Sequence, residues 1–257
     1  MEEIFQIKLS SRDLLVLAAL LGYESVFGVQ DDSFLSDIPD MKRAIRQSVR
    51  RLERKKYIRY DLDGTLYIQS SVRQLIDCVA APDAAGMFTT NLNGGKIASV
   101  YTLCRAGAVT TLLYVGEKKY QLQLWDASPF DQLLPSQLCR GEASPIRERM
   151  LYEEAVYVAD QFASFQQEEA LARLQKHLQD AATLKTVSGI LAGGCGYLRV
   201  QIRKRSGNLY RTAFQCLWTR SEDQTVSLMA DENNVLCFDA ADVDAVKAQI
   251  RTHMGAN

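Results

Sequence analysis

The feature that most constrains this chain is a run of four strand-like segments separated by very short turns, which occurs twice. The first run comprises residues 87–92, 97–105, 108–116 and 118–125. The second run comprises residues 197–204, 208–220, 224–231 and 234–239. Their separators, such as Asn-Gly-Gly and Ser-Gly-Asn, have turn-forming composition. Because short turns join antiparallel neighbours and parallel strands need long crossovers, each run predicts an antiparallel meander.

Helical patterns with recognisable start and stop residues flank both meanders. They cover residues 10–21, 40–57, 70–82, 126–134, 146–192 and 241–254. Ser or Asp residues precede several of these segments, and Gly or Pro follows some of them, as expected of helix caps. Segment 146–192 fits either one long helix or two. Between the second and third segments, Asp63-Gly64 predicts a tight hairpin within residues 57–68.

The two meanders end in similar sequences at a constant offset of 113 residues. Trp125-Asp126-Ala127 aligns with Phe238-Asp239-Ala240, and Asp131 aligns with Asp244. Acidic residues at these places suit the first turn of a helix. We therefore predict an α+β fold made of a duplicated unit, namely helices, a four-strand antiparallel meander and a helix, in a pseudo-twofold arrangement.

The predicted halves are residues 1–138 and 145–257, and the stretch between them, 135–145, has linker composition. The first half is expected to be helical and winged-helix-like over 1–83, with a meander and helix over 86–138. The second half is expected to be helical over 146–192, with a meander and helix over 196–254.

Composition limits the class of protein. Hydrophobic residues make up 47% and charged residues 24%, and the net charge is −1, so the whole surface is not basic although local patches are possible. No apolar run reaches the roughly 18 residues of a membrane helix. The N-terminus, "MEEIFQIKLSSRD", lacks the basic start of a secretion signal. We expect a cytoplasmic protein without membrane contact.

The sequence shows no catalytic or metal-binding constellation. It has two His residues, His177 and His253, and six Cys residues without a C-x-x-C pair. It has neither a G-x-S-x-G nor an H-E-x-x-H motif, and the Gly-Gly-Lys at 94–96 lacks phosphate-loop spacing. We expect buried thiols, no enzymatic activity, no cofactor and no metal.

Residues 42–59 form the most basic stretch, with nine Lys or Arg residues and one acid. Ile45, Val49 and Leu52 recur at helical spacing and predict one buried stripe, which leaves the basic residues on the other faces. One interpretation is a solvated helix face or one that pairs with acidic residues. Segment 142–180 offers such partners, with eight acidic residues against four basic ones.

The other interpretation of this stretch is DNA binding. The order of helix, basic helix and Asp-Gly hairpin resembles bacterial winged-helix regulators. Under that hypothesis Arg43, Arg46, Arg50 and Lys55 would contact phosphates or bases. The alternative function is therefore a winged-helix transcriptional regulator with a C-terminal sensing or dimerisation half.

Four passages resemble the EspG family, the cytosolic chaperones of ESX (type VII) secretion. They are "DLLVLAALLG" at 13–22, the passage through the -DG- turn to Pro82-Asp83 at 52–83, "LQLWDASPFDQLL" at 122–134, and residues 196–250. The resemblance spans nearly the whole chain and contains no catalytic signature. It implies a pseudo-twofold α+β fold, no catalysis, and binding of the helical tip of a secreted helical-hairpin heterodimer. The strongly basic stretch and the frequent Cys depart from the family pattern and suggest another class of small helical client.

A surface that binds a helical tip needs apolar positions with a polar rim. The apolar candidates in the first meander are Tyr101, Leu103, Leu112, Tyr114, Tyr120 and Leu122. Within the basic run 199–211, Arg203 and Arg205 are candidates for steering an acidic partner. Alternation of apolar residues fits a buried strand face equally well, and the basic run also fits a solvated one. The client, the binding face and the oligomeric state remain open at this point.

Overall fold

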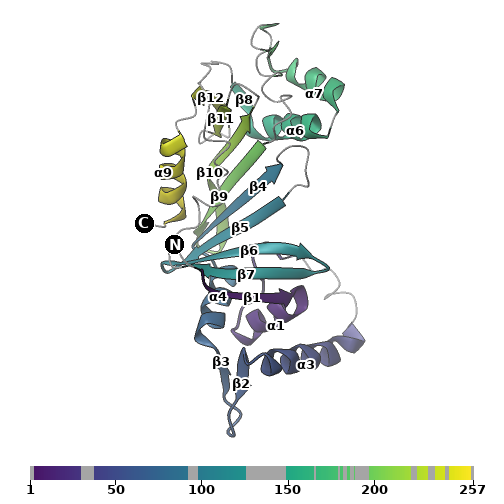
Figure 1. Cartoon of the computed structure of the whole chain (residues 1–257), viewed down its shortest axis with the longest axis vertical. Coiled ribbons are helices and arrows are strands. Elements are labelled where there is room, and N and C mark those ends of the chain that lie inside the picture. The colour runs from purple at the N-terminus through teal and green to yellow at the C-terminus, as the bar shows by residue number, and fades with distance from the viewer. Residues whose placement is uncertain are drawn as a thin grey trace. The chain divides into compact units, whose positions relative to one another are not determined.

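The computed structural model describes residues 3–29, 38–91, 98–125, 149–164, 166–178, 197–220, 225–230, 235–240 and 243–255, with five further residues between 180 and 188. These residues form two compact units (Figure 1). The first unit draws on Met1–Ala85 and Val100–Ser128, and the second on Gly86–Ser99 and Pro129–Gly255. The described residues contain six α-helices and antiparallel strand pairings. The predicted α+β class is therefore confirmed.

The first unit combines a group of antiparallel strands with three helices and a small hairpin. Its elements are β1 (Glu3–Ser10), α1 (Ser11–Leu20), α3 (Ile38–Arg54), β2 (Ile58–Tyr60), β3 (Leu66–Ile68), α4 (Ser70–Ala80), β5 (Ala98–Arg105, from Val100 on), β6 (Ala108–Gly116) and β7 (Lys119–Trp125). The strands lie in the order β1-β7-β6-β5, and β2 pairs with β3 separately. The helices predicted at 10–21, 40–57 and 70–82, the Asp-Gly hairpin and the strands predicted at 97–105, 108–116 and 118–125 are present.

Local chemistry accounts for the ends of these elements. The Ser10 hydroxyl accepts a hydrogen bond from the Asp13 backbone N–H at 3.1 Å, which caps α1. Gly22 follows α1 with a φ of +84°, a conformation that glycine adopts without steric cost. At the tip of the β2–β3 hairpin, Gly64 has a φ of +83°, and Asp63 accepts a hydrogen bond from the Thr65 N–H at 2.9 Å.

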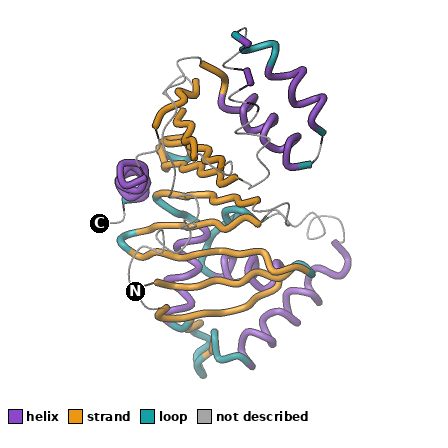
Figure 2. Tube along the Cα trace, turned by 45° about the horizontal axis from the view of Figure 1, so that its top comes forward, coloured by secondary structure: helices purple, strands orange, loops and turns teal. Residues whose placement is uncertain are grey.

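The core of the first unit lies between its strands and helices. Helices α1 and α4 pack against the strands, and α3 packs against α1 (Figure 2). The core side chains that are fully buried include Leu14, Leu17, Leu52, Leu75, Ile76, Leu103, Leu112 and Leu122. Burial of each such side chain stabilises the fold by roughly 1.5–3 kcal/mol. Leu52 belongs to the apolar stripe predicted for the basic helix, and Ile45 and Val49 are partly buried beside the same core.

The second unit has the same kinds of element. It contains β4 (Ala84–Asn91, from Gly86 on), β8 (Arg149–Leu151), α6 (Tyr152–Ala163), α7 (Gln167–Leu174), β9 (Tyr197–Ser206), β10 (Leu209–Arg220), β11 (Thr225–Ala230), β12 (Val235–Ala240) and α9 (Val243–Met254). The strand order is β4-β9-β10-β11-β12-β8. Helix α9 packs on β9 and β10, with Ile250 and Met254 buried and His253 stacked on Phe214 at 5.4 Å between ring centroids.

Helices α6 and α7 are held together by polar contacts as well as by packing. The guanidinium of Arg173 on α7 donates two hydrogen bonds to the carboxylate of Glu154 on α6. The same guanidinium lies 5.3 Å from the centre of the Tyr157 ring. A bidentate pair of this kind fixes the relative orientation of two short helices.

Two strands were not predicted, and within segment 146–192 the residues Arg149–Leu151 form a strand in place of the predicted helix. Strand β1 pairs antiparallel with β7, and β8 pairs antiparallel with β12. Each therefore lies beside the last strand of its meander but is far from it in the sequence, so no turn residues mark the pairing. Among the described residues of 146–192, the helical part begins at Tyr152 and includes the separate helices α6 and α7. The predicted helix at 126–134 and the linker at 135–145 lie outside the described residues.

Candidate docking surfaces

Most of the predicted apolar contact residues lie in the core of the first unit. Leu103, Leu112 and Leu122 have 0% exposure, and Tyr120 has 8%. They occupy the strand face that α1 and α4 cover, so in this structure they present no surface to a partner. Alternating apolarity here marks the buried face.

The two remaining tyrosines of that set are more accessible. Tyr101 is partly buried and packs edge-to-face against Phe27, with 5.9 Å between ring centroids. Tyr114 is 55% exposed and lies 5.4 Å from the ring of Tyr120. Of the six apolar candidates, Tyr114 therefore offers the largest accessible apolar area.

The opposite face of β6 and β7 carries a row of polar and aromatic side chains, which we call the ladder face (Thr111, Leu113, Gln121, Gln123 and Trp125). The Trp125 Nε1–H donates to the Thr111 hydroxyl at 3.0 Å, and that hydroxyl donates to Gln123 Oε1 at 3.2 Å. All except the buried Thr111 are half-buried. The sequence of β7 predicts this polar face, because the apolar residues Tyr120, Leu122 and Leu124 alternate with Gln121, Gln123 and Trp125.

In the second unit, the structure brings Arg203 and Arg205 together on β9. Both are exposed, and Arg205 donates to the Gly207 carbonyl at 3.0 Å. With Arg199 they form the basic stripe, which lies on one face of the strand because odd-numbered residues alternate with even ones. The even-numbered face carries Leu198, Val200 and Ile202, all at 0% exposure.

Helix α9 lies on the even-numbered face of β9, because His253 of α9 stacks on Phe214, the register partner of Ile202. Partial burial, with the nearby positive charge of Lys204, lowers the pKa of His253. Since Lys204 is even-numbered and His253 is on α9, the basic stripe lies on the strand face away from α9.

One arginine of α3 has a structural partner in α1. The Arg51 guanidinium donates to the Asp13 carboxylate, with 2.7 Å from Nη2 to Oδ1, and also to the Ser48 hydroxyl at 2.8 Å. Burial alone would raise the pKa of Asp13, but the hydrogen bonds from Arg51 and Ser48 and the charge of Arg51 outweigh it and lower that pKa. An acidic partner for the basic helix thus lies in α1.

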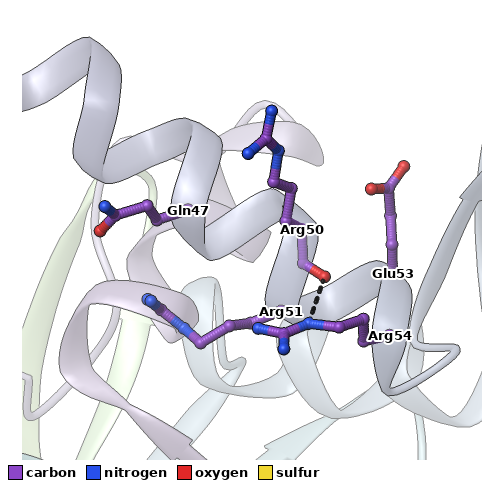
Figure 3. A pocket seen from close by; sticks show the side chains of 5 residues that line it. All are labelled: Gln47, Arg50, Arg51, Glu53 and Arg54. Carbon is purple, nitrogen blue, oxygen red and sulfur yellow. Dashed lines mark hydrogen bonds between the residues drawn. The ribbon is translucent and has the colours of Figure 1, made fainter.

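The other basic residues of α3 form an exposed row. Arg43, Arg46 and Arg50 recur at helical spacing and are exposed, and none has an ion pair within the described part of the chain. At the C-terminal end of the row, a groove of about 580 Å³ is lined by Gln47, Arg50, Arg51, Glu53 and Arg54 (Figure 3).

Lys55, the fourth nucleic-acid candidate, lies apart from this row. Its ammonium donates to the Lys8 carbonyl of β1 at 3.2 Å and lies 5.7 Å from the centre of the Tyr57 ring. The structure therefore brings together three of the four predicted residues and directs the fourth towards β1.

Groups with potential for chemistry are few among the described residues. No cluster of three or more His, Cys, Asp or Glu side chains suited to a metal occurs there. Cys78, Cys104 and Cys216 are buried. Burial raises the pKa of Cys104 to about 12, so its thiol stays protonated at neutral pH. No helix in the described part of the chain has the length and apolarity needed to cross a bilayer.

No protein-family model and no curated protein matches this sequence. Among solved structures, the chain is similar to the Mycobacterium tuberculosis type VII secretion system chaperone EspG5 in complex with a PE25–PPE41 dimer. The match has a TM-score of 0.58 and covers 98% of this chain and 96% of EspG5.

The chain has the fold of EspG5. At 12% identity the similarity shows the fold alone, and it confirms at that level the EspG resemblance drawn from the sequence. The similarity extends over nearly the full length of both chains, and thus includes the helices as well as the strands.

Proposed function

We propose that this protein is a non-enzymatic cytoplasmic chaperone or adaptor that binds small helical-hairpin proteins secreted by an ESX (type VII)-like system. The single observation that carries the proposal is the similarity to EspG5, a type VII chaperone solved with a PE25–PPE41 dimer. A match that covers 98% of this chain includes both units, so it is not a local similarity of one small motif.

The surfaces described above support this proposal physically. A helical client needs accessible aromatic or apolar positions surrounded by polar groups. The ladder face supplies Trp125 beside Gln123 and Leu113 opposite Gln121, and the basic stripe supplies exposed guanidinium groups. Arg203 and Arg205 would steer a client with an acidic tip, and their effect on the association rate would weaken with salt.

We also propose that residues 1–138 and 145–257 are copies of one duplicated unit. In each copy a strand precedes the helices and pairs antiparallel with the last strand of the following meander, as β1 does with β7 and β8 does with β12. The pairing of β1 and β8 is independent of the sequence repeat at the ends of the meanders, so it supports the duplication.

The test is co-expression of the chain with a pair of small helical-hairpin proteins encoded beside it, followed by size-exclusion chromatography with light scattering. The expected result is a soluble stoichiometric complex. The double variant Arg203→Glu/Arg205→Glu should slow its formation, whereas Arg43→Glu/Arg46→Glu, with the same charge change on α3, should not. Separate elution of the chain and a soluble client pair would refute the proposal.

A second candidate function is DNA binding, and the exposed row of Arg43, Arg46 and Arg50 favours it. These arginines lie on the helix that directly precedes the β2–β3 hairpin, as in a recognition helix and wing. Three phosphate contacts would give a slope of about −2.7 for log affinity against log salt concentration. Fluorescence anisotropy with a labelled duplex measures this slope, and the absence of binding at low salt would eliminate this candidate.

A further inference from the structure

A pocket of about 480 Å³ opens in the first unit where β1 continues into α1. Its wall is formed by these two elements, the end of α3 and the β6–β7 turn. Six of the ten lining residues are basic and one, Asp13, is acidic. The basic residues are Lys8, Arg12, Arg51, Lys55, Lys118 and Lys119.

The acidic side chains nearby neutralise only part of this charge. Asp13 forms its ion pair with Arg51, and Glu117 pairs with Lys119 at 2.8 Å. Lys8, Arg12 and Lys55 form no ion pair with an acidic side chain among the residues that the structure describes. Cations from three separate segments therefore converge without an internal counter-charge. The positive charges of these side chains repel one another, and a bound anion would replace this repulsion by attraction.

The side chains, and not the start of α1, would hold this anion. The Ser11 N–H already donates to the Lys118 carbonyl at 2.8 Å, and the Asp13 N–H donates to the Ser10 hydroxyl at 3.1 Å. The first of these bonds also ties the β6–β7 turn to α1, which places Lys118 and Lys119 at the pocket. Glu117 and Lys118 both adopt positive φ, 50° and 57°, a conformation uncommon for non-glycine residues.

The composition of the pocket indicates the class of ligand. A phosphate group carries more charge than a carboxylate and offers three terminal oxygens, which suits several converging ammonium and guanidinium groups. No aromatic residue lines the pocket, so it has no surface on which a nucleobase would stack. We propose that this pocket is a binding site for the phosphate groups of an oligophosphate anion, with Lys8 and Arg12 as its principal ligands.

Isothermal titration calorimetry with inorganic pyrophosphate tests this site. The wild-type chain should bind, and Lys8→Gln/Arg12→Gln should weaken binding about tenfold, since each cation contributes modestly at a partly exposed site. The matched control Lys42→Gln/Lys176→Gln removes two exposed charges elsewhere and should leave the affinity unchanged. Lys55 is not substituted because its bond to the Lys8 carbonyl supports the fold. Circular dichroism checks that each variant is folded.

Two further arms identify the source of the phosphate. ATP should bind about as well as tripolyphosphate, because the pocket has no aromatic side chain on which the adenine base would stack. If a labelled duplex binds through Lys8 and Arg12 and pyrophosphate displaces it, the phosphate of the site belongs to a nucleic-acid backbone.

The proposal is overturned if wild-type protein does not bind pyrophosphate, if both double variants weaken binding equally, or if a glutamate-rich peptide binds more tightly than pyrophosphate. None of these outcomes depends on the chaperone proposal, whose test uses Arg203 and Arg205 in the other unit.

Discussion

Replacement of Arg51 by Met should destabilise the first unit by about 2 kcal/mol. Removing one partner of a fully buried ion pair costs about 3–5 kcal/mol, whereas an exposed pair contributes about 0–1 kcal/mol. Here the Asp13 side chain is 7% exposed and the Arg51 side chain 36%, so we expect an intermediate cost. Met retains the aliphatic stem but removes the guanidinium that donates to the Asp13 carboxylate and to the Ser48 hydroxyl.

Urea unfolding followed by far-UV circular dichroism measures this loss. The matched control is Arg50→Met, which removes an exposed charge from the adjacent position and should change the unfolding free energy by less than about 0.5 kcal/mol. If the two units unfold in separate transitions, the loss of stability should be confined to the transition of the first unit, which contains Arg51 and Asp13.

The effect of Arg51→Met should also depend on pH. Because the folded pKa of Asp13 lies below its ordinary value of 3.8, the stabilisation is present above the unfolded pKa and is lost as the pH falls through the folded pKa. In the variant, only the hydrogen bonds from Ser48 and Ser10 still oppose burial, which favours the protonated carboxyl, so the pKa of Asp13 should rise. The difference between wild type and variant should therefore be largest near neutral pH and shrink below about pH 4. Equal differences at pH 7 and pH 3, or equal stabilities of the Arg51→Met and Arg50→Met variants, would refute this reasoning.

Three other predictions follow from the described contacts. Leu112→Ala removes a side chain with 0% exposure and should lower the unfolding free energy by about 3 kcal/mol in urea titrations; a loss below about 1 kcal/mol would contradict its place in the core. Arg173→Met should loosen the α6–α7 pair only slightly, because Arg173 is 41% exposed and solvent screens its ion pair. Hydrogen exchange should therefore increase in these two helices and not in α9. Cys104 should resist iodoacetamide at pH 8 until the protein is unfolded, because burial raises its pKa to about 12. Peptide mass spectrometry detects the modification, and a modified Cys104 in the folded chain would contradict this prediction.

Patterns of short range in the sequence predicted the fold well. The hairpin at Asp63-Gly64, the meander turns at Ala106-Gly107 and Ser206-Gly207 and the cap of α1 depend on a few adjacent residues, and the structure contains these elements. Helix α4 has no such cap, because Gln69 precedes it without a side-chain hydrogen bond. Strands β1 and β8 were missed because their pairing partners lie far along the chain, where no turn signals them. The ion pair between Arg51 and Asp13 was missed for the same reason, since 38 residues separate them.

The candidate site was harder to predict than the fold. A period of two shows that a strand has an apolar and a polar face, but it does not show which face the helices cover. Leu103, Leu112 and Leu122 satisfied the apolar pattern because they form the core. Arg203 and Arg205 were identified by charge and are exposed, because long charged side chains are seldom buried without a partner. The pocket around Lys8 and Arg12 depends on four segments coming together and has no local sequence signal.

Hydrogen–deuterium exchange on the complex of this chain with a co-expressed helical-hairpin pair tests the chaperone proposal most directly. The account predicts that complex formation protects β9 around Arg203 and Arg205, or β6–β7 along the ladder face, and leaves α3 unchanged. Protection confined to α3 and the β2–β3 hairpin, or the same protection produced by duplex DNA in place of the client, would contradict it.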